Sequence, residues 1–341
     1  MSTAKTFEKV EQELLNLIQS EFPLVEEPYK AIADQLGTSE QHVLDLMTDL
    51  KKRNVVRQVS AIFDTRRLGY KSSLVAMKFD DAKLDAAAQI INQHPGVSHN
   101  YGRTGFFNLW FTVAVAPGVS LDETVEQMGK ETNASAWRLL PTKQFFKIGV
   151  NFDMVNKRSN ASENYAAPAA KKNVGSDVDK DWNKAEPVSE RDIEVIRELQ
   201  EDLEIVSRPF DGMAERLGMA VQEMFDYSDD MVKRKLMRRF SAVLYHRRAG
   251  FSANAMVVWN VPPERSQEVG DQMAMSPHVT HCYERPTYDD WKYSHYTMIH
   301  ATTEDECEEI AVEIGKQIGI DDQQLVFSTR EYKKTRVRYF V

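Results

Sequence analysis

The stretch that decides the fold is Arg57-Gln58-Val59-Ser60-Ala61-Ile62-Phe63, which returns later in the chain as Arg238-Arg239-Phe240-Ser241-Ala242-Val243-Leu244. The match continues outward, from residues 65–70 to residues 246–251 and from residues 95–103 to residues 277–285. Self-similarity at one fixed offset is the mark of a duplicated structural unit. The chain is therefore expected to consist of two homologous halves.

Ahead of each copy, apolar residues recur every three or four positions, which is the period of an amphipathic helix. They are Leu14, Leu15, Ile18, Ile32 and Leu36 in the first half and Ile193, Ile196, Leu199, Met213 and Leu217 in the second. Pro28 and Gly37 are expected to begin and end one helix, and Pro209 and Gly218 repeat them. Thr38 and Gln41 predict the cap of the next helix. Three helices followed by a β-rich turn predict a winged helix-turn-helix unit in each half.

Behind each copy, strands and helices alternate in the order βαββαβ. In the first half, strands are expected at 73–79, 97–103, 107–116 and near 142–152, with helices at 84–93 and after Ser120. In the second half, strands are expected at 255–260, 279–285, 293–301 and near 332–340, with a helix capped by Thr303 and Glu306. This order is typical of a ferredoxin-like antiparallel sheet with two helices on one face.

The fold class is thus α+β, a tandem repeat of a winged helix-turn-helix unit and a ferredoxin-like domain. The expected boundaries are 1–57 and 58–154 for the first pair, 155–188 for a linker, and 189–239 and 240–341 for the second pair. This stretch has almost no aliphatic periodicity and is rich in Asn, Ala, Ser and Lys, which predicts a linker.

Composition excludes several classes of protein. The 341 residues are 42% hydrophobic and 28% charged, which is typical of folded globular domains. No apolar run approaches the roughly 20 residues that span a bilayer, and no signal-like N-terminus is present, so we expect a cytoplasmic protein without a membrane partner. Cys282 and Cys307 lie too far apart for a metal-ligand or disulfide pattern.

The element order of both halves resembles the Lrp/AsnC family of transcription regulators. The predicted recognition helix nevertheless carries acidic residues along most of its length. These are Glu40, Asp45 and Asp49 in the first half and Glu223, Asp226, Asp229 and Asp230 in the second. A net charge of −9 adds to the repulsion of a DNA duplex. DNA is therefore disfavoured as a partner, and the helices are expected to serve packing.

The best functional signal is a duplicated H-x-Y-x-R motif, formed by His99, Tyr101 and Arg103 in the first half and by His281, Tyr283 and Arg285 in the second. Alternate residues of a strand share one face, so an imidazole, a phenol and a guanidinium should project together. A solvated sheet face with a structural tyrosine is the alternative. The presence of two copies at corresponding positions favours a functional site, and we expect one productive pocket where the halves meet.

Aromatic residues and further cations follow these motifs. Such a set suits a large flat ligand that bears carboxylates, such as a tetrapyrrole. The additional binding candidates are Arg66, Arg67, Asn108, Trp110, His246, Arg247, Arg248, Trp291, His295, Lys333, Lys334 and Arg336. Taken singly, each cationic cluster also fits a solvated strand end.

The segments 99–103, 107–112, 239–244 and 328–340 resemble the sirohaem (siroheme) decarboxylases. Members of that family have the Lrp/AsnC architecture without regulating transcription, and they usually occur as two related subunits, which here resemble a fusion. The resemblance implies loss of carbon dioxide from the C12 and C18 acetates of sirohaem, giving 12,18-didecarboxysirohaem. This is a carboxy-lyase step in alternative haem or haem d1 biosynthesis.

The residues of the two motifs fit that chemistry. The conjugated macrocycle can delocalise the carbanion, so no cofactor is expected, and the iron is carried by the substrate. His99 and His281 are candidate proton donors, Arg103 and Arg285 would anchor carboxylates, and Tyr101 and Tyr283 would orient the groups. A homodimer of the fused chain is a further expectation. A tetrapyrrole-binding sensor and a transcription regulator remain as alternatives.

One position departs from the family pattern. Where the second subunit usually reads Tyr-Asn-Leu, this chain has Tyr293-Ser294-His295, which puts the asparagine contact in doubt. His295 and His300 are either iron ligands or strand histidines in polar contacts, and no protein metal site is predicted. The halves are therefore expected to be unequal.

Overall fold

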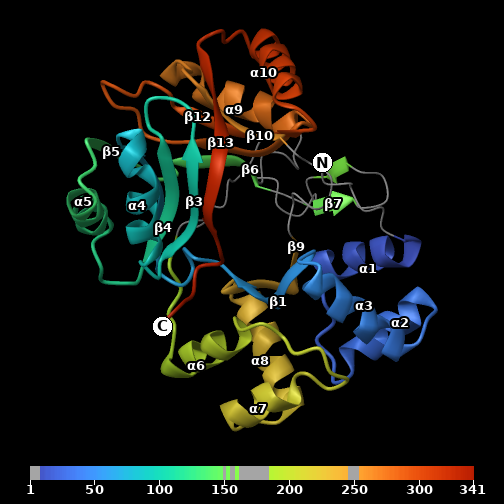
Figure 1. Ribbon diagram of the computed structural model, residues 1–341. Coiled ribbons are helices and arrows are strands. Elements are labelled where there is room, and N and C mark those ends of the chain that lie inside the picture. Colours follow the sequence, from blue (N-terminus) through green and yellow to red (C-terminus); the bar gives the residue numbers. More distant parts are fainter. Residues whose placement is uncertain (1–7, 149–150, 154–157, 161–183, 245–252) are drawn as a thin grey trace.

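The computed structural model describes residues 8–148, 151–153, 158–160, 184–244 and 253–341, and it has the expected tandem α+β architecture (Figure 1). Each half begins with three helices: α1 (Lys9–Ser20), α2 (Pro28–Leu36) and α3 (Glu40–Lys52), then α6 (Glu190–Leu199), α7 (Asp211–Leu217) and α8 (Val221–Lys233). Gly37 and Gly218 end α2 and α7 in the left-handed conformation, with φ of 64° and 63°. The cap of α3 is Ser39, whose hydroxyl accepts a hydrogen bond from the His42 amide, so the predicted cap at Thr38 is wrong.

The repeated stretch of residues 57–63 pairs with its own copy at residues 238–244. Strands β1 (Val56–Phe63) and β9 (Met237–Leu244) form a two-stranded antiparallel sheet that joins the halves. Buried residues of both helical units and both strands form one hydrophobic cluster. The β-rich stretch that follows each helical unit therefore finds its strand partner in the other half.

Two ferredoxin-like sheets follow. The first has the strand order β5-β2-β4-β3 and comprises β2 (Lys71–Lys78), β3 (Val97–Arg103), β4 (Leu109–Val115) and β5 (Ala136–Leu140). The second has the equivalent order β13-β10-β12-β11 and comprises β10 (Ala253–Trp259), β11 (Val279–Glu284), β12 (His295–Ala301) and β13 (Gln323–Lys334). The predicted ferredoxin-like arrangement is confirmed.

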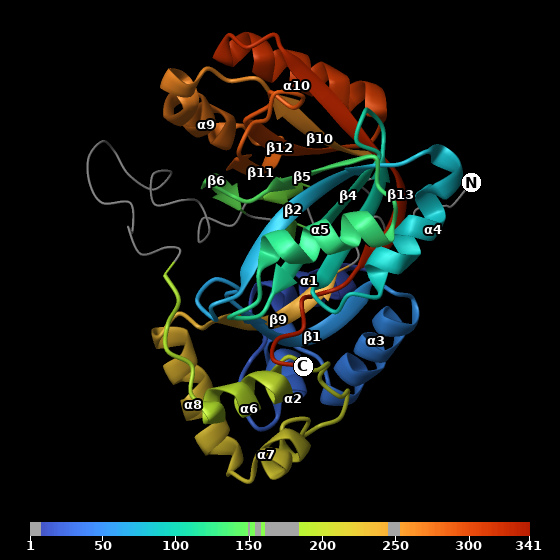
Figure 2. The same ribbon diagram turned by 90° about the vertical axis from the view of Figure 1, so that its left-hand side faces the viewer.

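The sheets lie face to face, and the helices cover their outer sides. Helices α4 (Asp81–Asn92) and α5 (Leu121–Glu131) pack on the first sheet, while α9 (Ser266–Met275) and α10 (Glu304–Ile318) pack on the second (Figure 2). A short 3-10 helix, η4 (Pro263–Arg265), precedes α9. A fourth cluster fills the space between the sheets and contains Trp110, Trp291 and Tyr296. The inner faces of the two sheets therefore share one core.

Strand exchange closes this sandwich. Residues 323–327 of β13 pair with β10, whereas residues 328–334 pair with β3 of the first half. In the same way β6 (Gln144–Ile148) leaves the first half and pairs with β11. Two more short strands, β7 (Asn151–Asp153) and β8 (Arg158–Asn160), pair with each other.

This exchange corrects two predicted strands. The strand expected near 142–152 is mainly β6, which belongs to the second sheet, and β5 at residues 136–140 completes the first. The strand expected near 332–340 runs instead from Gln323 to Lys334. Residues 335–341 have no regular secondary structure, and their polar groups bond to both halves, for example Arg336 to Ser60 of β1 and Tyr339 to Gln200 beside α6.

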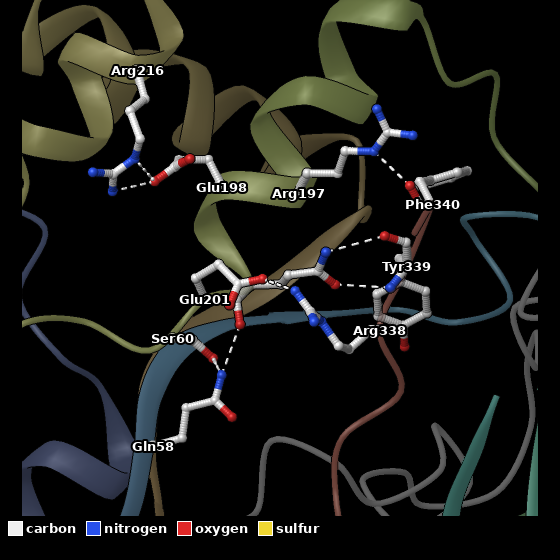
Figure 3. A network of polar contacts seen from close by, with 10 residues as sticks. Gln58, Ser60, Arg197, Glu198, Glu201, Arg216, Arg338, Tyr339 and Phe340 are labelled. Carbon is white, nitrogen blue, oxygen red and sulfur yellow. Dashed lines mark hydrogen bonds and ion pairs between the residues drawn. The ribbon is translucent and has the colours of Figure 1, made fainter. Parts of the chain in front are cut away.

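The C-terminal tail docks beside α6 (Figure 3). The Gln200 side chain accepts a hydrogen bond from the Tyr339 amide at 2.8 Å and donates one to the Tyr339 carbonyl at 3.1 Å. Arg338 forms an ion pair with Glu201, and Arg197 donates to the Phe340 carbonyl at 2.5 Å. The tail thus ties the last strand of the second sheet to the second helical unit.

Basic residues at the ends of α3 and α8 form ion pairs with carboxylates of the same chain. Lys51 contacts Asp202 at 2.5 Å, Arg53 contacts Glu11 at 2.5 Å, and Arg234 contacts the buried carboxylate of Asp192 at 2.8 Å. These three cations are therefore held by carboxylates of the same chain. Within the described ranges, no helix is long and apolar enough to span a bilayer.

Candidate functional site

Both H-x-Y-x-R motifs line one cavity of about 330 Å³ between the two sheets. His99, Tyr101 and Arg103 reach it from β3, and His281, Tyr283 and Arg285 reach it from β11 and the residue after it. The two-residue period of a strand places each set on one face, and the stacking of the sheets turns those faces toward each other. The six predicted catalytic residues are therefore brought together.

The two motif histidines have equivalent surroundings. Nδ1 of His99 lies 3.0 Å from the Ser98 hydroxyl, and Nδ1 of His281 lies 3.1 Å from the Thr280 hydroxyl. Burial, with nearby Lys334 and Arg57, lowers the pKa of His99 to about 4. Burial lowers the pKa of His281 to about 4 as well, helped by His300, His99 and Lys147. Both imidazoles are therefore neutral near pH 7 in the free protein.

The motif arginines connect the halves. Nη1 of Arg103 donates to the Val326 carbonyl at 3.0 Å, and Nη1 of Arg285 donates to the Leu140 carbonyl at 2.5 Å. Val326 lies in the second half and Leu140 in the first, so each arginine bonds to a strand of the opposite half. The two guanidinium groups also lie over the rings of Tyr101 and Tyr283, at 5.3 and 4.9 Å. Because burial lowers the pKa of Arg103 only to about 10, that side chain keeps its charge near pH 7.

Aromatic and aliphatic side chains form most of the remaining wall. They are Leu74, Trp110, Phe111, Met256, Tyr296 and Met298. Trp291 supports this wall from behind: its ring lies 5.5 Å from that of Trp110, and its Nε1 donates to the Tyr296 hydroxyl at 2.7 Å. Among the described residues no carboxylate lines the cavity. The site thus combines flat apolar surface with positive charge.

Two predicted contacts are corrected by the structure. The Asn108 amide bonds to the backbone of Phe79 at 2.9 Å in both directions and so holds the start of α4. His295 is 0% exposed, stacks on Phe146 at 5.5 Å and places Nε2 3.1 Å from the Ser266 carbonyl. Because Tyr296 points into the cavity, its neighbour His295 points to the opposite face of the sheet. Neither Asn108 nor His295 lines the cavity, and His295 serves the packing of β6 and α9.

Some residues of the predicted cationic clusters bond to other parts of the fold, and one of them lines the cavity. Arg67 pairs with Glu186 at 3.0 Å, and Lys333 donates to the Asn92 carbonyl at 2.7 Å, so both are held by the fold outside the cavity. Arg66 lies 5.7 Å over the Phe145 ring, at the edge formed by β6. Lys334 lines the cavity. His246, Arg247 and Arg248 lie outside the described residues.

A second cavity of about 500 Å³ adjoins the first, because His99 lines both. It lies between β1, the start of β3 and the C-terminal tail, and its cations include Arg57, Arg336 and Arg338. Nη1 of Arg336 donates to the Ser60 hydroxyl at 2.7 Å, whereas its buried Nη2 has no partner among the described residues. A buried donor without a partner is costly, so this arginine is suited to receive an acid group.

Sequence reasoning missed Asn254, Met256 and Met298 and considered His300 as an iron ligand or as a strand histidine in a polar contact, without placing it in the substrate cavity. All four residues line the cavity. The alternation of β10 and β12 places residues 254 and 256 on the same face, and residues 296, 298 and 300 as well. That alternation in the sequence could have predicted that these residues face the cavity. In the described part of the chain, no group of three His, Cys, Asp or Glu residues could hold a metal ion.

The comparisons with known proteins match this architecture. The family model "AsnC-like ligand binding domain" matches residues 67–147 and 248–333. The model "Siroheme decarboxylase NirDL-like HTH domain" matches residues 11–57 and 192–238. Each model therefore matches once in each half, which reproduces the internal repeat.

Relatives that match the whole chain and relatives that match one half of it are both siroheme decarboxylases. A siroheme decarboxylase of Hydrogenobacter thermophilus is 38% identical over 96% of this chain and 94% of its own length. A siroheme decarboxylase beta subunit of Methanosarcina barkeri is 47% identical and matches 43% of this chain and 97% of its own length. The crystal structure of the siroheme decarboxylase NirDL in complex with an iron-uroporphyrin III analogue has a TM-score of 0.73 and 32% identity, covering 98% of this chain and 95% of that one. With its duplicated architecture and its two facing motifs, the chain belongs to the siroheme decarboxylase family.

Proposed function

We propose that this protein is a sirohaem decarboxylase that removes carbon dioxide from the C12 and C18 acetates and yields 12,18-didecarboxysirohaem. The observation that carries the proposal is the meeting of both H-x-Y-x-R motifs in one cavity that no described carboxylate lines. Such a cavity attracts an acidic ligand and repels none of its carboxylates. Its aromatic wall suits the flat macrocycle.

The reaction needs little from the protein besides position and a proton. The bond between the acetate methylene and its carboxylate carbon breaks, carbon dioxide leaves, and the electron pair stays on the methylene carbon. The macrocycle of the substrate delocalises that pair, and a proton then converts the methylene into a methyl group. Each decarboxylation therefore consumes one proton, and the substrate brings its own iron, so we propose that no further cofactor is used.

His99 and His281 are the proposed proton donors. Each is neutral in the free protein, because burial and neighbouring positive charge lower its pKa to about 4. A substrate carboxylate beside the imidazole offsets that positive charge and raises the pKa again. Substrate binding would thus load a proton onto the residue that later delivers it, as general acid catalysis requires.

Arginine and apolar surface have separate tasks in this mechanism. Arg103 and Arg285 lie over Tyr101 and Tyr283 and direct positive charge into the cavity, where they hold carboxylates that do not react. The apolar wall removes water from the reacting carboxylate, which favours loss of its charge as carbon dioxide. Tyr101 and Tyr283 keep the histidines and arginines in place.

The enzyme would act in alternative haem or haem d1 biosynthesis, in the cytoplasm, where buried free thiols such as Cys282 and Cys307 remain reduced. Two fused chains would associate as a homodimer, which light scattering of the purified protein tests.

The direct test is anaerobic incubation of the purified chain with sirohaem, followed by mass spectrometry of the pigment. Two successive losses of carbon dioxide are expected. A pigment that binds with unchanged mass would replace the enzyme with a tetrapyrrole sensor.

A further inference from the structure

The two sheets contribute corresponding strands to the cavity, so each residue of one wall has a counterpart in the other. Comparing these counterparts shows where the two halves differ. His99 pairs with Thr112 across the first sheet, and His281 pairs with Met298 across the second. Two positions further along, Ala114 pairs with Ser72 in the first sheet, whereas His300 pairs with Asn254 in the second. The second half therefore adds an imidazole and an amide where the first half has a methyl group and a hydroxyl.

The hydrogen-bonding groups of His300 and Asn254 are largely unused. The Asn254 Oδ1 accepts a hydrogen bond from the Ser328 hydroxyl at 3.2 Å, which leaves the amide nitrogen as a donor. That nitrogen, and both ring nitrogens of His300, make no hydrogen bond to any described residue. Both side chains nevertheless line the cavity. Donors placed there at the cost of their hydration are suited to a ligand.

Lys334 completes this part of the wall. It lines the same cavity and lies opposite His99 in the pairing of β13 with β3. Burial lowers the pKa of His300 to about 4, with added repulsion from Lys334 and Arg103. The charged groups that act on His300 are thus cations, and they favour an anion over a metal ion as its neighbour.

We propose that Asn254, His300 and Lys334, here called the donor corner, bind a carboxylate of the tetrapyrrole that does not react. This inference rests on the proposed function. In a uroporphyrin-type macrocycle the acetate and propionate of one pyrrole ring stand on adjacent carbons. Because Lys334 lies opposite His99, a propionate in the donor corner would place the acetate of the same ring toward His99. The donor corner would therefore decide which acetate faces the proton donor.

The sharpest test replaces two residues of the second half with their counterparts in the first half. The double variant His300→Ala with Asn254→Ser creates the pair that the first half already uses, which limits the risk of misfolding. Binding of iron-uroporphyrin III and of sirohaem is measured by Soret titration, and turnover is measured anaerobically with mass analysis of the products. Loss of hydrogen bonds to a charged group predicts a Kd and KM about 10- to 100-fold higher. The kcat is expected to change less, since His99 and His281 are retained.

Two matched variants separate carboxylate binding from other roles. His300→Gln keeps a side-chain donor without a titrating ring. Compared with the single variant His300→Ala, it should restore most of the affinity for the tetrapyrrole. His278→Ala removes an exposed histidine of the same half and should leave Kd, KM and product pattern unchanged. A His300→Gln variant as weak as His300→Ala, or a wild-type iron spectrum that shows histidine ligation lost in His300→Ala, would overturn the proposal.

The failure of this inference can be told apart from failure of the proposed function. If the wild-type chain decarboxylates sirohaem and the double variant matches it in KM and products, the donor corner is refuted and the enzyme assignment stands. If the wild-type chain binds iron-uroporphyrin III without decarboxylating sirohaem, the assignment fails. In that case a higher Kd of the double variant for iron-uroporphyrin III still supports the donor corner, and an unchanged Kd refutes it.

Discussion

At the scale of single residues, the site depends on three imidazoles kept neutral by burial. His99, His281 and His300 each have a pKa of about 4, below the ordinary value of 6.5. The unfolded chain therefore binds protons in a pH range where the folded chain does not. This makes the free energy of unfolding sensitive to acid.

The sign of that dependence follows from proton linkage. The stability that these three histidines contribute should be greatest above pH 6.5, fall as the pH drops from 6.5 toward 4, and level off below 4. One pH unit below its ordinary value, each buried histidine costs about 1.4 kcal/mol. Urea unfolding at about pH 7.5 and about pH 5.5 should show that His300→Gln loses roughly that much less stability than the wild type. Equal losses in both proteins would contradict the neutral, buried state of His300.

At the scale of elements, the exchange of β6 depends on a glycine of α9. A Cβ atom at Gly270 would lie 2.3 Å from the ring of Phe146, which β6 brings over from the first half. The close approach allows β6 to pack against α9 while it pairs with β11. Helix propensity alone would favour alanine at this position.

Gly270→Ala is therefore expected to destabilise the protein by about 1–3 kcal/mol in urea unfolding, because the added methyl group displaces Phe146. Gly212→Ala in α7 is the matched control, since its nearest contact is the flexible end of Arg216 at 3.3 Å. That variant should keep or slightly raise stability. If the two substitutions had the same effect, the packing of β6 on α9 would be refuted.

At the scale of the whole molecule, the halves complete each other. Three pairings cross between them, β1 with β9, β3 with β13 and β6 with β11, and both motifs line one cavity. A half on its own would expose edge strands and the apolar inner face of its sheet.

A chain cut within residues 161–183 should therefore yield two fragments that copurify as a one-to-one complex and retain activity. Either fragment alone should self-associate or aggregate and should lack the full activity, as size-exclusion chromatography with light scattering and the sirohaem assay would show. A stable monomeric half with full turnover would contradict the shared site.

The sequence alone determined the duplication, the order of helices and strands, and the six motif residues. Each of these follows from local periodicity or from a direct match between the halves. Tertiary structure decided the rest. The pairing of β1 with β9 and the exchange of β6 and β13 depend on partners far away in sequence, which local patterns do not specify. The same holds for individual side chains: His295 carried the more conspicuous signal, yet the pleat of β12 turns it into the core, while His300, on the other face, enters the cavity. Composition shows which groups a chain possesses, and only the packing of two sheets decides which of them meet.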